Sequence, residues 1–129
     1  MRTHNGAEQA ITNAIMQDSR WTHAVSYTVH NCESAGQIWI RCYEAMERLL
    51  AVEPTADFHI GVCRKHPLEH FHGHGVIKSR LHIKPMRSLF RGGRAEIKRL
   101  YGRAGWANYV SPQYLTDTII DRDRFEGGE

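Results

Sequence analysis

The chain has 129 residues, of which 41% are hydrophobic and 24% are charged, and its formal net charge is +3. This length suffices for one domain with a hydrophobic core, and the composition excludes a chain that is disordered throughout. No window approaches the roughly 18 uninterrupted apolar residues of a membrane span, and no apolar signal segment opens the chain, so we expect an intracellular protein with no membrane partner. Three cysteines without C-x-x-C spacing argue against a disulfide framework.

The first half of the chain has the patterns of two helices and two strands. We expect, in order, a helix over residues 7–18, a strand over 21–30, a helix from Asn31 or Ser34 to about Leu50, and a strand over 58–63. The first strand alternates, with Val25 and Tyr27 on one face and Ser26 on the other.

The second half begins with a strand over residues 71–77, which we expect to form a hairpin with 58–63. Residues 80–89 are ambiguous because Pro85 limits any helix there. A basic helix over 94–103, a strand or helix over 106–110 and a helical end over 112–121 complete the prediction. The fold class that follows is α+β: a central antiparallel sheet flanked by helices, forming one domain over 1–124 with a flexible tail over 125–129.

Positive charge is concentrated after the third strand. Nine Lys or Arg residues and one acid, Glu96, lie between Lys78 and Arg103, a balance typical of proteins with a polyanionic partner. The residues that we expect to hold a nucleic-acid backbone are Lys78, Arg80, Lys84 and Arg87. Phe90, Tyr101 and Trp106 are candidates for stacking on unpaired bases, although core packing is the stronger expectation for Trp106.

Five of the nine histidines lie between His59 and His74. Alternation places His70, His72 and His74 on one face of the third strand, where two imidazoles can hold a divalent ion and leave positions open for substrate. For the third ligand we favour His66, with His59 and Glu69 as alternatives. The adjoining glycines are expected to let a backbone or a phosphate approach closely. Imidazole suits Zn²⁺, whereas phosphodiester oxygens in the coordination sphere make Mn²⁺ or Mg²⁺ usable.

Several segments together resemble a known family of nucleases. They are the strand 21–28, the following helix, the strand that enters His70-Phe71-His72-Gly73, and the segment Trp106-Ala107-Asn108-Tyr109. Their order over residues 20–115 is similar to that in the HUH endonucleases, and more narrowly in the rolling-circle replication initiator (Rep) proteins of small DNA viruses and plasmids. The resemblance implies a ferredoxin-like or RNA-recognition-like sheet. It also implies either a prokaryotic cytoplasm or, for a eukaryotic virus, the host nucleus.

The resemblance also implies an activity. Either His70 and His72 or His72 and His74 would bind the divalent ion. A tyrosine would attack single-stranded DNA at a replication origin or nick site, form a 5′-phosphotyrosine, and later rejoin the ends. By position this tyrosine is Tyr109, with Tyr114 and then Tyr101 as alternatives. Residues 64–66 lack the acid that is frequent in the family, and Pro112 replaces its usual lysine. The sequence contains no G-x-x-x-x-G-K-[ST], so we expect no nucleoside triphosphate site.

Other functions fit the same residues less completely. A non-catalytic nucleic-acid-binding module would use the basic block and would be indifferent to chelators. A cupin-type oxygenase also presents H-x-H but needs a glutamate a few residues later, and the first acid after His74 is Glu96. A phosphoesterase with paired H-x-T motifs is disfavoured because no H-x-T occurs.

Overall fold

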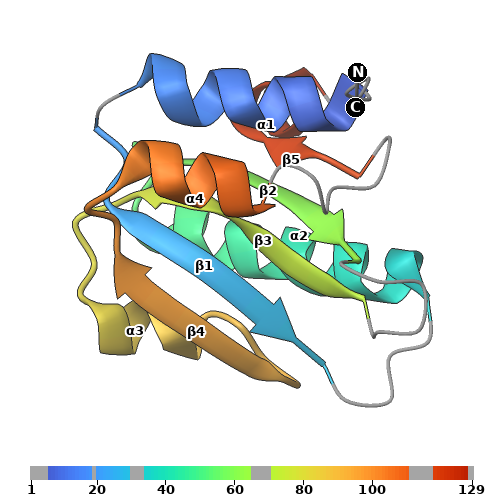
Figure 1. The fold of residues 1–129 in the computed structure, drawn as a ribbon. Helices are drawn as coiled ribbons and strands as arrows, with labels where there is room; N and C mark the ends of the chain where they lie inside the picture. The colour runs from blue at the N-terminus through green and yellow to red at the C-terminus, as the bar shows by residue number, and fades with distance from the viewer. Residues whose placement is uncertain (1–5, 19, 30–33, 65–70, 111–117, 128–129) are drawn as a thin grey trace.

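The computed structural model describes residues 6–18, 20–29, 34–64, 71–110 and 118–127. It contains one five-stranded antiparallel sheet with helices on both faces, which confirms the expected α+β class (Figure 1). The strands are β1 (His23–Thr28), β2 (Asp57–Cys63), β3 (His72–Lys78), β4 (Arg94–Arg99) and β5 (Ile120–Asp121). The helices are α1 (Gly6–Gln17), α2 (Ala35–Val52), α3 (Ile83–Ser88), α4 (Arg103–Val110) and α5 (Arg122–Gly127).

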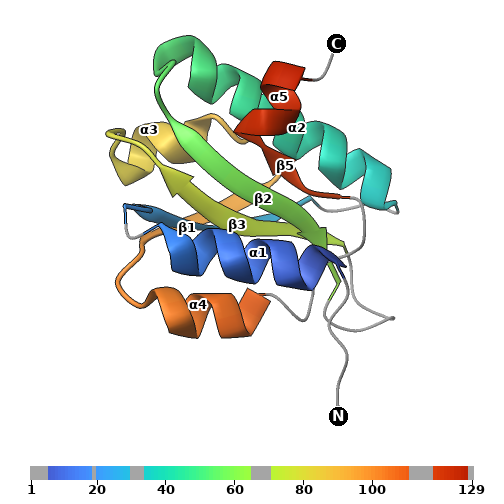
Figure 2. The same ribbon diagram turned by 90° about the horizontal axis from the view of Figure 1, so that it is seen from above.

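The strands lie in the order β4-β1-β3-β2-β5, so β1 and β3 are next to one another at the centre. The predicted hairpin of β2 and β3 is confirmed, with Gly61 opposite His74 and Cys63 opposite His72. Helices α1 and α4 lie on one face of the sheet, and α2 and α3 lie on the other (Figures 1 and 2). Within the described ranges, no helix combines the length and the apolar character needed to cross a membrane.

The larger core lies between the sheet and helix α2. Helix α2 begins after Ser34, whose side chain accepts a hydrogen bond from the Gln37 backbone, while the Gln37 side chain accepts one from Ser34. This capping box satisfies backbone N–H groups that have no partner within the helix. The helix then buries an apolar stripe against the sheet, made of Ile38, Cys42, Ala45, Met46 and Leu49. The alternation predicted for β1 is also confirmed, because Val25 and Tyr27 belong to this core.

Residues 94–103 do not form the predicted basic helix. Residues 94–99 are strand β4, and α4 begins only at Arg103. Ala95 and Ile97 are buried, whereas Arg94, Glu96 and Lys98 are exposed, so the burial has the period of two that a strand requires. Pairing with β1 along this whole segment outweighs the helix propensity of its Ala, Glu, Lys and Arg residues.

The turn before β4 explains how this strand reaches the sheet. Gly92 has a φ of 80°, in the left-handed region that favours glycine, and it turns the chain between α3 and β4. The Tyr27 hydroxyl donates a hydrogen bond to the Arg91 carbonyl just before this turn. Pro85 is the third residue of α3, where the missing N–H costs no intrahelical bond.

The carboxyl-terminal segment departs from the prediction of a helix over 112–121. Residues 111–117 lie outside the described part of the chain, and Ile120–Asp121 pairs with β2 as strand β5. Residues 125–127, which we expected in a flexible tail, belong to α5. Phe125 lies 4.3 Å from Tyr43 between ring centroids and contacts Phe58 edge-on, so this helix is tied to the larger core.

The glycines of β3 have a packing role on the face that α2 covers. A Cβ atom added at Gly75 would lie 2.1 Å from the His59 carbonyl oxygen and 2.7 Å from Ile60 Cα. Of the two expectations for these glycines, close approach of a backbone or of a phosphate, the first is confirmed: the neighbouring strand β2 lies against Gly75. Gly73 and Gly75 point away from the histidines.

We expect Gly75→Ala to lower the free energy of unfolding by about 1–3 kcal/mol or more, because backbone atoms must move to admit the methyl group. Gly102→Ala is the matched control, since nothing lies within 4 Å of a Cβ there. Urea denaturation of both variants measures the difference. Equal midpoints for the two variants would contradict the packing role.

A buried histidine gives the fold a pH dependence. His23 has no exposed surface, and burial, reinforced by the charge of Arg99, lowers the pKa of its imidazole despite the opposing effects of hydrogen bonding to the Leu81 backbone and of the Glu53 charge. The unfolded chain therefore binds a proton that the folded chain resists. The stability that the folded chain has with a neutral His23 is fully present above the usual histidine pKa of about 6.5. It is lost as the pH falls towards the lowered pKa of the folded state.

We expect the free energy of unfolding to fall as the pH is lowered from about 7 to 5, and His23 alone should contribute at most about 1.4 kcal/mol per pH unit. Urea denaturation at a series of pH values measures this fall. His23→Gln should flatten that part of the curve, whereas the exposed His82→Gln should not. An unchanged pH slope in His23→Gln would show that other groups cause it.

Candidate functional site

The two histidines of β3 share one face of the sheet with the side chains of β1 and β4. Because His74 lies opposite Ser26 on β1, and Ser26 opposite Glu96 on β4, the three residues form a row across the sheet. A second row contains His72, Thr28 and Arg94. With strands about 4.8 Å apart, each row spans about 10 Å, so imidazole, hydroxyl, carboxylate and guanidinium groups lie within one small area.

The histidine rings contact one another and one of them is oriented by β1. The ring centroids of His72 and His74 are 4.5 Å apart, with the rings at 81°. Ser26 Oγ lies 2.9 Å from His74 Nδ1, which directs the Nε2 side of this ring away from β1. His74 is 5% exposed, so its position is set by packing as well as by this hydrogen bond.

Helix α4 places an aromatic pair over these histidines. Trp106 and Tyr109 are stacked with centroids 5.7 Å apart, and their rings lie 5.7 Å and 5.9 Å from that of His74. The indole Nε1 of Trp106 donates a 3.0 Å hydrogen bond to the Gly75 carbonyl, which fixes the helix to β3. Trp106 is therefore a packing residue, as expected, whereas Tyr109 is 51% exposed.

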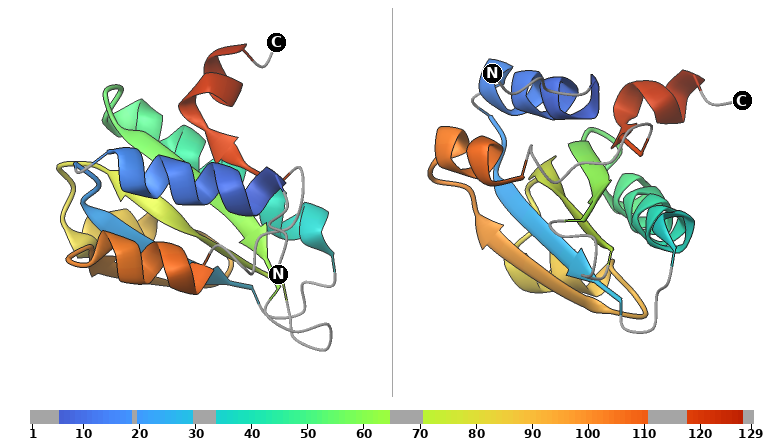
Figure 3. Two further views of the ribbon diagram at one scale, coloured as in Figure 1. Left: turned by 45° about the horizontal axis from the view of Figure 1, so that its top comes forward. Right: turned by 45° about the vertical axis from the view of Figure 1, so that its right-hand side comes forward.

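The start of α4 is also held by α1. The Arg103 guanidinium donates a 2.8 Å hydrogen bond to the carbonyl of Met16, in the last turn of α1. A cation in this position satisfies a carbonyl that has no partner within the helix. The side-by-side arrangement of α1 and α4 is visible from two further directions (Figure 3).

Together these groups line an open cavity of about 330 Å³. Its lining residues are Ser26, Thr28, His72, His74, Arg94, Glu96 and Tyr109. Of the candidates named from the sequence, the cavity unites His72, His74 and Tyr109. Ser26, Thr28, Arg94 and Glu96 were missed as site residues, although the polar face of the strand 21–30 was itself a signal for the first two.

Two further candidates that the structure describes, Tyr101 and His59, lie away from this cavity. Tyr101 is 92% exposed and precedes α4. His59 lines a different cavity, next to Asp57 and Asp121. The candidates His66, Glu69, His70 and Tyr114 lie outside the described residues.

The predicted cationic residues are dispersed rather than gathered at the cavity. Lys78 forms ion pairs of 3.4 Å with Asp18 and 3.9 Å with Asp57, and the Arg80 backbone N–H binds Glu53. Arg20 and Lys78 hold the pKa of the Asp18 carboxyl at about 2, the hydrogen bonds from Arg20 being the main cause. Lys84 is exposed on α3, and Arg87 lines a groove beside β4.

The donor set of the cavity suits a divalent cation. Two imidazoles and one carboxylate, His72, His74 and Glu96, are groups that bind Mn²⁺ or Zn²⁺. Among the described residues, no three His, Cys, Asp or Glu side chains are close enough together to form a complete metal site. The metal site expected from the sequence therefore stays a prediction, and within the described residues the cavity holds two of its expected ligands, His72 and His74. Comparison with known proteins found no matching family model, no matching curated protein and no matching solved structure.

We expect Trp106→Phe to lower the free energy of unfolding by about 1–2 kcal/mol, because it removes the hydrogen bond that fixes α4 and leaves the Gly75 carbonyl without it. Urea denaturation measures this loss. Trp21→Phe is a comparable control, since its indole also donates to a backbone carbonyl, that of Ala14, but away from the cavity. The Trp106 variant alone should change the tyrosine environment in near-ultraviolet circular dichroism.

Proposed function

We propose that this protein is a metal-dependent endonuclease that nicks and rejoins single-stranded DNA through Tyr109, in the manner of the HUH endonucleases that the sequence resembles. The observation that carries the proposal is the placement of Tyr109 beside His72 and His74 in one open cavity. A second support is the order β1-α2-β2-β3-α3-β4 with the sheet order β4-β1-β3-β2, which agrees with the ferredoxin-like arrangement that the resemblance implies.

The sequence leaves two histidine registers open, and the described residues support one of them. In the pair His72 and His74, both rings line the cavity that contains Tyr109. The other pair includes His70, which lies outside the described residues. We therefore assign His72 and His74 as the metal-binding pair.

Each residue then has a chemical role in strand cleavage. When bound, Mn²⁺ or Mg²⁺ would supply positive charge that polarises the scissile phosphate. Ser26 contacts His74 at Nδ1, so Nε2 is the nitrogen that would hold the metal. Arg94 places a guanidinium at the rim, where it can bind a neighbouring phosphate.

Tyr109 would supply the nucleophile. Its phenolic oxygen attacks phosphorus, the P–O3′ bond breaks, and the proton finally resides on the released 3′-oxygen. The new phosphotyrosine is itself a phosphodiester, so the reverse attack by a 3′-hydroxyl rejoins the strand without a nucleoside triphosphate. Trp106 and Arg103 fix the amino-terminal part of α4, which limits the positions that Tyr109 can adopt.

The test is capture of the covalent intermediate. A fluorescent pool of random-sequence single-stranded DNA is incubated with the protein and Mn²⁺, then resolved on a denaturing gel. We expect a labelled protein band that disappears with chelator, with Tyr109→Phe and with His74→Ala, and that persists in Tyr101→Phe, whose ring lies outside the cavity.

Two results would contradict the assignment. A band that survives in Tyr109→Phe but vanishes in Tyr114→Phe would transfer the nucleophile to Tyr114. A wild-type protein that retards the DNA on a native gel, with or without chelator, and never forms the band would identify a non-catalytic binding module. Circular dichroism of each variant controls for loss of folding.

A further inference from the structure

Strand β4 lies at one edge of the sheet. This strand ends the sheet, and among the described residues no strand pairs with its outer side. Leu100 N–H donates to the Thr22 carbonyl at 2.9 Å, and the register continues as Lys98 opposite Ala24 and Glu96 opposite Ser26. Because hydrogen-bonded pairs alternate in an antiparallel ladder, the N–H and C=O groups of Ala95 and Ile97 point outward.

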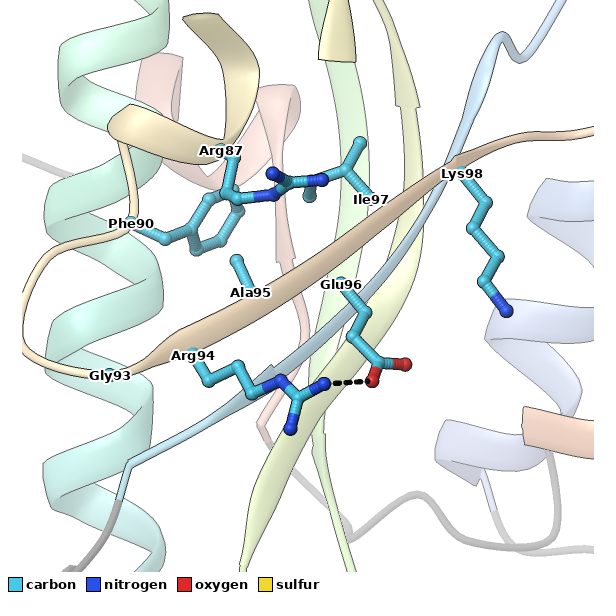
Figure 4. A pocket seen from close by; sticks show the side chains of 8 residues that line it. All are labelled: Arg87, Phe90, Gly93, Arg94, Ala95, Glu96, Ile97 and Lys98. Carbon is cyan, nitrogen blue, oxygen red and sulfur yellow. Dashed lines mark ion pairs between the residues drawn. The ribbon is translucent and has the colours of Figure 1, made fainter. Parts of the chain in front are cut away.

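A groove runs along this edge beside α3. It has a volume of about 520 Å³ and is lined by Arg87, Phe90, Gly93, Arg94, Ala95, Glu96, Ile97 and Lys98 (Figure 4). Figure 4 shows Arg87 and Phe90 on one side of β4 and Glu96 and Lys98 on the other. An edge strand next to a helix, with its main-chain groups directed into a groove, can accept one further strand.

The charges along the groove select the chemistry of that strand. Arg94, Glu96 and Lys98 alternate as cation, anion and cation on one face of β4, and Arg87 adds a cation from α3. The Arg94–Glu96 ion pair, at 3.4 Å, joins two side chains that are 77% and 53% exposed, so a partner can replace it at little cost. Neutral apolar strands are disfavoured at such an edge, whereas an acidic strand is attracted.

A polypeptide fits this edge better than a nucleic-acid backbone. Phosphodiester groups only accept hydrogen bonds, so phosphates along the edge would face the Ala95 and Ile97 carbonyls as well as the Glu96 carboxylate. A peptide strand supplies both N–H donors and carbonyl acceptors at the spacing that β4 presents. It can also place a cation opposite Glu96.

We propose that β4 is a docking edge for an extended acidic segment of a partner protein, which adds to the sheet as a sixth strand. To complement the charges of β4, the partner strand would carry an anion, a cation and an anion at alternate residues. This order reads the same in both directions, so the charges alone permit parallel or antiparallel addition. The proposal does not depend on the nuclease activity, and its test uses no cleavage.

The test measures binding of a fluorescein-labelled peptide with the core Glu-Val-Lys-Val-Glu to the full chain by fluorescence anisotropy. Lys98→Glu should weaken binding about three- to tenfold, because one cross-strand attraction becomes a repulsion. Lys84→Glu, on the exposed surface of α3 and outside the groove, should change binding little. The peptide Lys-Val-Glu-Val-Lys should bind Lys98→Glu more tightly than it binds the wild type.

Methylated peptides distinguish strand addition from simple charge attraction. N-methylation of one alternate set of peptide amides should abolish binding, and methylation of the other set should be tolerated, because only one set faces β4. Equal binding of both methylated peptides would overturn the proposal. Displacement of the peptide by a random single-stranded oligonucleotide, combined with indifference to methylation, would instead identify the groove as a nucleic-acid site.

Discussion

The alternating faces of strand β3 separate the packed core of this protein from its candidate site. Because successive side chains of a strand point to opposite faces, residues 73, 75 and 77 must face α2 while residues 72, 74 and 76 face α1 and α4. Small residues on the first face let β2 and α2 pack closely, and this packing secures β3 at the centre of the sheet. The histidines on the second face therefore belong to a strand that close packing holds in place. Such support is needed to keep a reacting group in one position.

The site combines elements that are far apart in sequence but adjacent in the sheet. β1 orients a histidine, β4 contributes a carboxylate and a guanidinium, and α4 adds the tyrosine. A helix carries the tyrosine, and two side-chain hydrogen bonds from the helix's own residues attach it to the rest of the fold. The metal and the DNA strand belong to the proposal, whereas the convergence of these side chains is a property of the fold.

Much of this arrangement was predictable from residue patterns. The alternation in residues 21–30, the Ser34 cap and the hairpin of 58–63 with 71–77 are local signals that tertiary packing reinforces. The placement of Tyr109 near the histidine strand was expected from family resemblance rather than from periodicity. Residues 94–99 were misjudged because their composition favours a helix, and only pairing with β1 makes them a strand. Since Glu96 joins the site through that pairing, it could not be assigned to the site while the segment was taken for a helix.

The contact between Arg103 and the last turn of α1 gives the amino-terminal helix a role beyond covering the sheet. It links the first described element of the chain to the helix that carries Tyr109, between residues 87 positions apart in sequence. A binding partner that contacts the carboxyl-terminal end of α1 would therefore influence the position of Tyr109 without touching the cavity. Such a partner would act by loosening the carboxyl-terminal end of α1. Opening a helix end requires little free energy compared with unfolding the core.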